Sequence, residues 1–239
     1  MLVHSFESMG ARDGEGIRFI VFLAGCPLRC VYCHNPDTWE GSGRGYTPEE
    51  IVKKALRYKP YFKNSGGVTF SGGEPLLQSE EIVKTALLLK EKGIGYALDT
   101  SLALPLTDSV KKAIDGADMI LADLKFPDSS LMKKYTSKPL ENTLASFDYI
   151  KSINKRFIIR TVVVPEINDR EEILLKYLDL VERYSPEYWE LLPFHTMGFF
   201  KYEEKGITNP LKDTHALEIT KLESLKSYLR EKTAVKIKK

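Results

Sequence analysis

The chain has 239 residues, of which 43% are hydrophobic and 28% are charged, an ordinary composition for a folded globular protein. Its 35 basic and 33 acidic side chains give a formal net charge of +2, so charge makes no case for nucleic acid as a partner. No apolar run approaches the roughly 20 residues that span a bilayer, and the first residues do not read as a secretory signal. We therefore expect a cytoplasmic protein with no membrane partner.

Apolar and β-branched runs predict six strands. The first covers residues 17–24, and its nearly continuous apolar character is typical of a strand that is buried on both faces. The other five are predicted at residues 68–70, 96–98, 119–122, 157–164 and 189–192.

Helical periodicity fills the intervals between these strands. Residues 47–50 (Thr-Pro-Glu-Glu) predict a helix start, with an N-cap, a proline at the first helical position and a capping-box glutamate. Further helices are expected from about Ser79 to a stop at Gly93, over 106–114, over 141–153, after a cap at Asn168 or Asp169, and from about Thr214 to Arg230. The polar segment 196–212 is expected to be irregular and mobile near the site.

This alternation predicts an α/β fold with a parallel sheet and right-handed crossovers. In such folds the functional residues gather at the carboxyl ends of the strands. Those ends carry Cys26–Cys33, Ser71–Glu74, Asp99 and Thr100, Asp123–Lys125, Arg160 and His195. No linker or repeat divides the sequence, so we expect a single domain over residues 1–239.

All three cysteines, Cys26, Cys30 and Cys33, fall within eight positions in a CxxxCxxC pattern. Three thiols cannot all pair within one chain, and cytoplasmic thiols stay reduced. A metal or redox role is therefore favoured over a disulfide framework.

Three metal centres compete for this loop. A Cys₃His zinc site would need His34 as its fourth ligand, but the adjacent Cys33 and His34 would bind one ion only with difficulty. A c-type haem fits Cys30 to His34 but leaves Cys26 unexplained and requires export. A [4Fe–4S] cluster on the three thiolates leaves one iron without a protein ligand, because such clusters normally take four thiolates. The cluster is the favoured interpretation. An open iron indicates catalysis, with a plain iron–sulfur electron-transfer protein as the alternative from another class.

The CxxxCxxC loop after a first apolar strand resembles the radical S-adenosylmethionine (radical SAM) superfamily. Within it, the chain is similar to the glycyl-radical-enzyme activases along nearly its whole length. The matching residues are 4–8, 13–19, 25–35, 37–39, 71–74, 99–100, 123–125, 160, 162–165 and 191–195.

The resemblance implies a partial (β/α)₆ TIM-like barrel and, at the open iron, S-adenosylmethionine bound by its amino and carboxylate groups. A flavodoxin or ferredoxin would supply the electron that cleaves this cofactor into methionine and a 5′-deoxyadenosyl radical. That radical would remove a hydrogen atom from a glycine of a partner enzyme, with pyruvate formate-lyase as the expected partner. A monomer is expected.

An activase of a different glycyl-radical enzyme is the alternative partner assignment. Many such activases carry a ferredoxin-like insert with additional cysteines. The 38 residues between Cys33 and Gly72 contain no cysteine, so that branch is disfavoured.

The resemblance also implies roles for individual residues around the cofactor. Gly72, Gly73 and Glu74 would bind the methionine amino group, and glycines do expose backbone for close approach. The methionine carboxylate, the ribose and the adenine would be contacted by a set comprising Tyr32, His34, Asp123, Leu124, Lys125 and His195.

Two further groups stand at the strand ends. Asp99, Thr100 and Asp123, with the backbone carbonyl of Leu121, resemble the family's site for a monovalent cation, although Ser101 and Leu102 replace the usual Asn-Gly. Arg160 is predicted to bind an anion, because a strand interior rarely carries an unpaired charge. Residues 13–16 are a weak signal that the resemblance places near the protein substrate.

Overall fold

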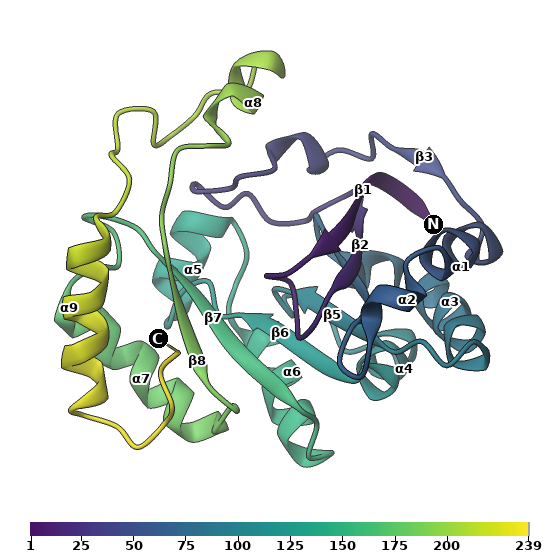
Figure 1. The fold of residues 1–239 in the computed structure, drawn as a ribbon. Helices are drawn as coiled ribbons and strands as arrows, with labels where there is room; N and C mark the ends of the chain where they lie inside the picture. The colour runs from purple at the N-terminus through teal and green to yellow at the C-terminus, as the bar shows by residue number, and fades with distance from the viewer. Residues whose placement is uncertain (239) are drawn as a thin grey trace.

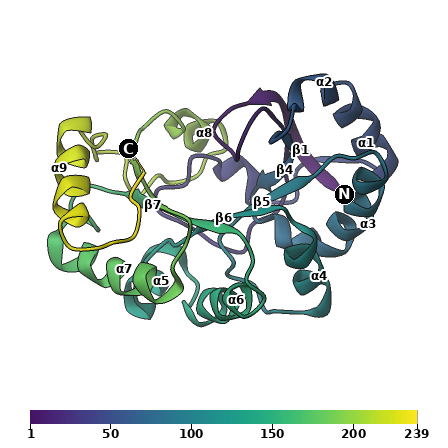
Figure 2. The same ribbon diagram turned by 60° about the horizontal axis from the view of Figure 1, so that its bottom comes forward.

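The computed structural model describes residues 1–238, in which eight strands form one sheet in the order β3-β1-β2-β4-β5-β6-β7-β8. Each neighbouring pair from β2 to β8 is parallel, whereas β1 pairs antiparallel with both β2 and β3. The sheet curves without closing, and the helices lie along its outer side (Figures 1 and 2). This open half-barrel confirms the predicted fold class.

All six predicted strands are present, within two residues of the expected bounds. They are β2 (Arg18–Leu23), β4 (Gly67–Gly72), β5 (Tyr96–Thr100), β6 (Met119–Asp123), β7 (Phe157–Val163) and β8 (Trp189–Pro193). Strands β1 (Leu2–Gly10) and β3 (Arg44–Gly45) were not predicted. Both lack a buried apolar face, since β1 buries only Val3 and Gly10 and β3 is fully exposed.

Residues 1–238 also form nine α-helices and two short 3₁₀ helices. The α-helices are α1 (Pro48–Leu56), α2 (Lys59–Phe62), α3 (Ser79–Glu91), α4 (Asp108–Gly116), α5 (Ser129–Thr136), α6 (Glu141–Ser152), α7 (Glu171–Tyr184), α8 (Phe199–Glu204) and α9 (Ile219–Arg230). The 3₁₀ helices are η1 (Pro36–Thr38) and η2 (Pro75–Gln78). The predicted capping box of α1 is present: Thr47 and Glu50 each accept the other's backbone N–H, at 3.3 and 2.8 Å.

Several predicted helix boundaries were wrong. Arg170, rather than Asn168 or Asp169, precedes α7, because those two side chains instead accept the backbone N–H groups of Val164 and Glu166 in the turn after β7. Helix α5 was not predicted, and α9 begins at Ile219 rather than near Thr214. The segment 196–212, expected to be irregular, contains α8.

Strand alternation explains why the inner face of the sheet changes character along its length. Residues two apart on a strand point to the same side. A small apolar cluster of Ala97, Met119, Leu121 and Ile158 is buried on the inner face. On the same strands, Asp99, Asp123 and Arg160 follow Ala97, Leu121 and Ile158 by two residues each. The inner face is thus apolar at the amino half of the strands and charged at the carboxyl half. None of the helices in residues 1–238 is both long and apolar enough to cross a membrane.

Candidate active site

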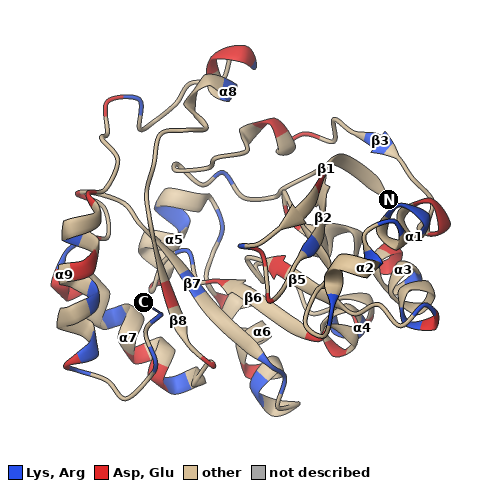
Figure 3. Cartoon of the chain, in the orientation of Figure 1, with Lys and Arg blue, Asp and Glu red and all other residues tan. Residues whose placement is uncertain are grey.

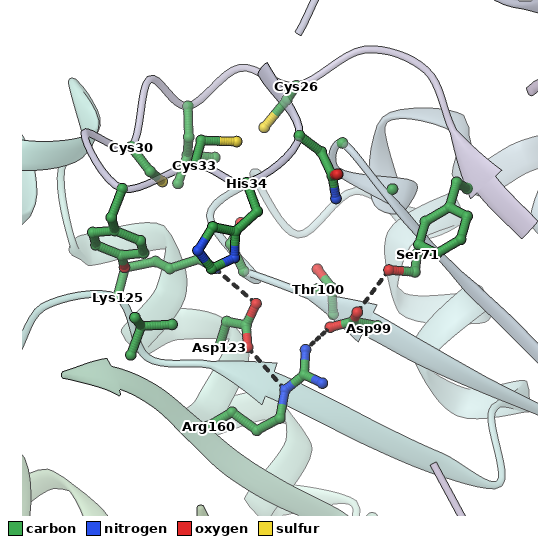
Figure 4. A pocket seen from close by; sticks show the side chains of 18 of the residues that line it. Cys26, Cys30, Cys33, His34, Ser71, Asp99, Thr100, Asp123, Lys125 and Arg160 are labelled. Atoms are coloured by element: carbon green, nitrogen blue, oxygen red, sulfur yellow. Dashed lines mark hydrogen bonds and ion pairs between the residues drawn. The ribbon is translucent and has the colours of Figure 1, made fainter. Parts of the chain in front are cut away.

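The carboxyl ends of the strands surround a cavity of ≈ 260 Å³ (Figure 4). Its lining brings together most of the residues that the sequence analysis selected: Cys26, Cys30, Tyr32, Cys33, His34, Ser71, Gly72, Gly73, Asp99, Thr100, Asp123, Lys125 and Arg160. These residues come from the ends of five elements that are far apart in the sequence. The predicted convergence at one end of the sheet is therefore confirmed.

The cysteine loop, defined as residues 26–34, is fixed through its backbone. The N–H of Cys26 donates to the carbonyl of Trp39 at 3.2 Å, and that of Cys33 donates to Cys30 at 3.1 Å. On the outer side, Arg29 and Val31 donate to the carbonyls of Thr136 and Tyr135 at 2.8 and 3.0 Å. The three thiols are thereby held in one cavity wall without a disulfide.

The thiols fit an iron–sulfur cluster better than a single ion. No three His, Cys, Asp or Glu side chains in residues 1–238 converge on one metal position. Instead of completing a zinc site, His34 places its Nε2 at 3.0 Å from the carbonyl oxygen of His195. In a [4Fe–4S] cluster each cysteine binds a different iron, so the sulfurs need not meet at a point. Burial raises the pKa of Cys26 to about 12 and also raises those of Cys30 and Cys33, so metal binding must release protons.

The turn after β4 needs its glycines because it packs against the chain that leads into the cysteine loop. Gly72 has φ +111°, and a Cβ on it would lie 2.3 Å from the backbone nitrogen of Leu23. A Cβ on Gly73 would lie 2.1 Å from the carbonyl oxygen of Gly25. The N–H groups of Gly73 and Glu74 donate to Leu23 and Gly25, both at 2.9 Å. Close approach of backbone to backbone therefore explains these glycines, in addition to the predicted approach to a ligand.

Glu74 does not reach the cavity. Its side chain is buried, and its carboxylate accepts hydrogen bonds from Thr100 Oγ1 (2.6 Å), the backbone N–H and Oγ of Ser101 (2.9 and 2.5 Å) and the N–H of Leu76 (3.1 Å). Burial raises its pKa, although these hydrogen bonds oppose the shift. Glu74 therefore ties the turn after β4 to the end of β5, and the structure does not bring it into the predicted contact with a ligand.

Arg160 joins the two carboxylates at the ends of β5 and β6. Its Nη2 bonds to Asp99 Oδ1, and its Nε donates to Asp123 Oδ1 at 3.0 Å (Figure 4). Burial raises the pKa of Asp99 to about 6. Burial acts the same way on Asp123, but attraction to Arg160 and Lys125 outweighs it and lowers that pKa. Lys125 Nζ donates to Asp123 Oδ2 at 2.7 Å. Arg160, which was predicted to bind an anion, thus already binds Asp99 and Asp123. These are the two carboxylates that the resemblance assigned to a monovalent cation.

His34 lines the cavity and is one member of a stacked histidine pair. The rings of His34 and His195 stack with centroids 3.7 Å apart and planes 9° from parallel, although only His34 lines the cavity. Burial lowers both pKa values, that of His34 to about 4, so both rings are neutral at pH 7. His195 Nδ1 and the Tyr32 hydroxyl are buried without a hydrogen-bond partner among residues 1–238. Tyr32 lines the cavity, so a polar ligand there could satisfy its unpartnered hydroxyl.

Four predicted residues are absent from the cavity lining, and others join it. Besides Glu74 and His195, these are Leu121 and Leu124, whose side chains are buried; for Leu121, only the backbone carbonyl was predicted as a ligand. Asp13, which was a weak signal, does line the cavity, together with Phe22, Trp39, Val162 and Leu192, which were not selected individually. The local sequence cannot distinguish an apolar strand residue that lines a cavity from one that is buried in the core.

The segment after β8 also reaches the cysteine loop. We call residues 195–204 the strap. The Tyr202 hydroxyl donates to the Cys33 carbonyl at 2.9 Å, and Lys201 Nζ donates to Asn35 Oδ1 at 2.7 Å. Residues 196–212 were expected near the site, but these two hydrogen bonds were not predicted, because a polar segment carries no signal for partners 166 and 169 residues away.

The half-barrel and its three-cysteine loop define a radical SAM protein. The family model described as the Radical SAM superfamily matches residues 20–178, which is more than half of the chain.

Curated relatives specify the branch. The chain is 42% identical to the pyruvate formate-lyase-activating enzyme of Clostridium pasteurianum, over 96% of this chain and 97% of that protein. It is 38% identical to that of Streptococcus mutans, over 100% and 94%, and 40% identical to that of Staphylococcus aureus, over 90% and 89%. The chain therefore belongs to the family of pyruvate formate-lyase-activating enzymes, which are radical SAM enzymes.

Solved structures agree on the fold. SuiB of Streptococcus suis, bound to the precursor peptide SuiA, superposes with a TM-score of 0.70 at 14% identity, over 91% of this chain and 47% of SuiB. A domain of pyruvate-formate lyase-activating enzyme from Bacteroides vulgatus gives a TM-score of 0.56 at 22% identity, over 72% and 98%.

Proposed function

We propose that this chain installs a glycyl radical on pyruvate formate-lyase, using a [4Fe–4S] cluster on Cys26, Cys30 and Cys33 and S-adenosylmethionine as its cofactor. The observation that carries the proposal is the shared cavity. Three thiols, a glycine turn and the charged ends of β5, β6 and β7 line one space of ≈ 260 Å³. When bound, the cluster supplies the electron for reductive cleavage of the cofactor's sulfur–C5′ bond, which yields methionine and a 5′-deoxyadenosyl radical.

The chain's own residues position the cofactor. The backbone of Gly72 and Gly73 faces the cavity and is proposed to receive the methionine amino group. Lys125 lines the same cavity just after β6 and is proposed as the cation for the carboxylate, although it also donates to Asp123. His34, neutral and stacked on His195, offers a flat surface to adenine. Tyr32 lines the same cavity with an unpartnered hydroxyl, and His195, which does not line it, has an unpartnered Nδ1.

Asp13 is proposed to face the partner's glycine. It lines the cavity from the loop before β2, and Thr69 Oγ1 donates to its carbonyl at 2.7 Å. Burial raises the pKa of Asp13, with Arg160 opposing the shift. The loop thus places a polar group at the cavity, on a different element from the cysteine loop.

A monovalent cation beside Asp99, Thr100 and Asp123 remains part of the proposal. It would compete with Arg160, which binds both carboxylates, and with Glu74, which accepts from Thr100. We also propose residues 1–239 as one radical SAM core domain, a monomer and a flavodoxin or ferredoxin as reductant.

Anaerobic reconstitution with iron and sulfide tests the proposal. Mixed with S-adenosylmethionine and dithionite, the loaded protein is expected to release 5′-deoxyadenosine. A plain electron-transfer protein would release none, and that result would reject the enzyme. Adding pyruvate formate-lyase is expected to give a glycyl radical signal by electron paramagnetic resonance. If the protein cleaves S-adenosylmethionine but produces no glycyl radical signal, the result would indicate that its partner is a different glycyl-radical enzyme.

A further inference from the structure

The outer side of the cysteine loop carries a cluster of positive charge. Arg29 belongs to the loop itself and is exposed. Lys133 and Lys134 are exposed in the last turn of α5, and Lys138 follows shortly after that helix. We call these four residues the basic face. Figure 3 shows Lys and Arg positions on α5 and on the neighbouring loop.

Backbone hydrogen bonds hold the parts of the basic face together. The N–H of Arg29 donates to Thr136 and that of Val31 donates to Tyr135, at 2.8 and 3.0 Å. Cys30 lies between Arg29 and Val31, so its backbone runs directly against the end of α5. A protein seated on this end of α5 would therefore be separated from the Cys30 thiol by a single layer of chain.

The charge of the basic face is not neutralised within the fold. None of its four residues forms an ion pair with any residue in 1–238. The acidic residues nearest in sequence are occupied at the opposite end of α5. There Asp128 pairs with Lys176 at 3.0 Å, and Glu141 accepts from Ser129 at 2.6 Å. Solvated lysines are common on helices, but here they adjoin a thiol loop.

The cavity itself leaves little room for an electron donor. Its ≈ 260 Å³ is the space in which the proposed function places the cofactor and the partner's glycine. The thiols line this inner side, so the outer side of the loop is the remaining short route to the cluster. An electron donor that docks there could act while the cavity is occupied.

We infer that the basic face is the docking site for an acidic one-electron donor protein. The inference rests on the proposed function, because the loop needs an electron only if it holds the cluster. In each encounter the donor's reduced cofactor loses one electron and the oxidised cluster gains it. Opposite charges on the two proteins speed their encounter, and salt weakens that effect.

The test uses the cluster-loaded protein with a fully reduced flavodoxin as the probe. The variant is Lys133→Glu/Lys134→Glu, which keeps Arg29, whose Nη1 donates to the loop carbonyls of Cys26 and Leu28 at 2.7 and 2.8 Å. The matched control is Lys90→Glu/Lys92→Glu, two exposed lysines at the end of α3. Bleaching of the cluster's visible absorbance gives the reduction rate, with dithionite as a small reductant for comparison.

Reduction of the α5 variant by flavodoxin is expected to slow by at least about tenfold at low ionic strength. High salt should narrow the difference, and reduction by dithionite should stay within about twofold, since a small ion needs no docking site. The α3 control should behave like the original protein. Equal flavodoxin rates for the α5 variant and the original protein would overturn the docking site while leaving the proposed function intact. Failure of the original protein to release 5′-deoxyadenosine with dithionite would reject the proposed function itself.

Discussion

The hydroxyl of Tyr202 donates a 2.9 Å hydrogen bond to the backbone carbonyl of Cys33, across 169 residues of sequence. Tyr202 is buried, and its ring packs edge-on against Trp39 with centroids 6.0 Å apart. The strap thereby fastens the cysteine loop from the far edge of the open sheet. Stability of the loop thus depends on a segment that the cysteine pattern does not include.

Replacement of Tyr202 by phenylalanine tests this fastening. The variant keeps the ring but leaves the Cys33 carbonyl unpaired, so the free energy of unfolding should fall by about 1–3 kcal/mol. Anaerobic urea unfolding of the metal-free protein measures it. Tyr61→Phe, which removes the same oxygen from an exposed ring, should change little. Equal losses in the two variants would contradict the role of the hydrogen bond.

Gly198 should not tolerate a side chain. A Cβ there would lie 2.5 Å from the carbonyl oxygen of His34 and 2.9 Å from its Cα. Gly198→Ala must therefore displace the strap or the loop, at a cost of about 1–3 kcal/mol. Gly45→Ala is the control, because nothing lies within 4 Å of its added methyl group. Faster proteolysis in the strap is the expected readout, and a digestion pattern like that of the control would argue against the contact.

His34 should make stability depend on pH. Its folded pKa is about 4 against an ordinary value of 6.5, because burial disfavours the charged ring. Between pH 6.5 and pH 4, His34 binds a proton in the unfolded chain but stays neutral in the folded chain. Its contribution to the free energy of unfolding is therefore fully present above pH 6.5 and is lost as the pH falls to 4. Over this pH range, the free energy of unfolding of the metal-free protein should fall by up to about 3 kcal/mol more than that of the His34→Gln variant. Parallel stability profiles for the two proteins would show that His34 titrates normally.

The position of Glu74 distinguishes a structural role from contact with the cofactor. Glu74→Ala removes the acceptor for Thr100, Ser101 and Leu76, and it should cost at least about 1–3 kcal/mol of stability, because buried donors are left unsatisfied. Glu80→Ala, an exposed neighbour on α3, should cost far less. A variant of normal stability that had lost only its affinity for S-adenosylmethionine would restore Glu74 as a direct ligand.

Cys30 is the thiol nearest the basic face and tests the cluster. After anaerobic reconstitution, Cys30→Ala should bind far less iron, with a loss greater than the roughly tenfold that removing a supporting residue causes. Iron analysis and visible absorbance measure it. Far-ultraviolet circular dichroism should show an unchanged fold, since alanine is small and apolar in this buried position. Full iron content in the variant would rule out the three-thiolate site.

Much of the fold could be predicted because buried strands and helix starts have characteristic local sequence patterns. Six strands and the α1 capping box follow from apolar runs and from Thr47 and Glu50, whose interactions are local. Strand β1 was not predicted because only Val3 and Gly10 of its nine residues are buried, so its sequence lacks a clear alternation. Cap assignments at Asn168 and Asp169 failed because a turn and a helix start compete for the same side-chain oxygens.

By itself, the sequence determined the three-thiol loop and the end of the sheet at which it stands, since thiol spacing and strand order are properties of the chain. Only the tertiary structure decided that Glu74 turns inward, that His34 stacks on His195, that Tyr202 bonds to Cys33 and that α5 lies against Arg29. Each of these contacts joins segments that meet only after the sheet has curved. A residue's type fixes which bonds it can make, while the path of the distant chain fixes which partner is there to make them.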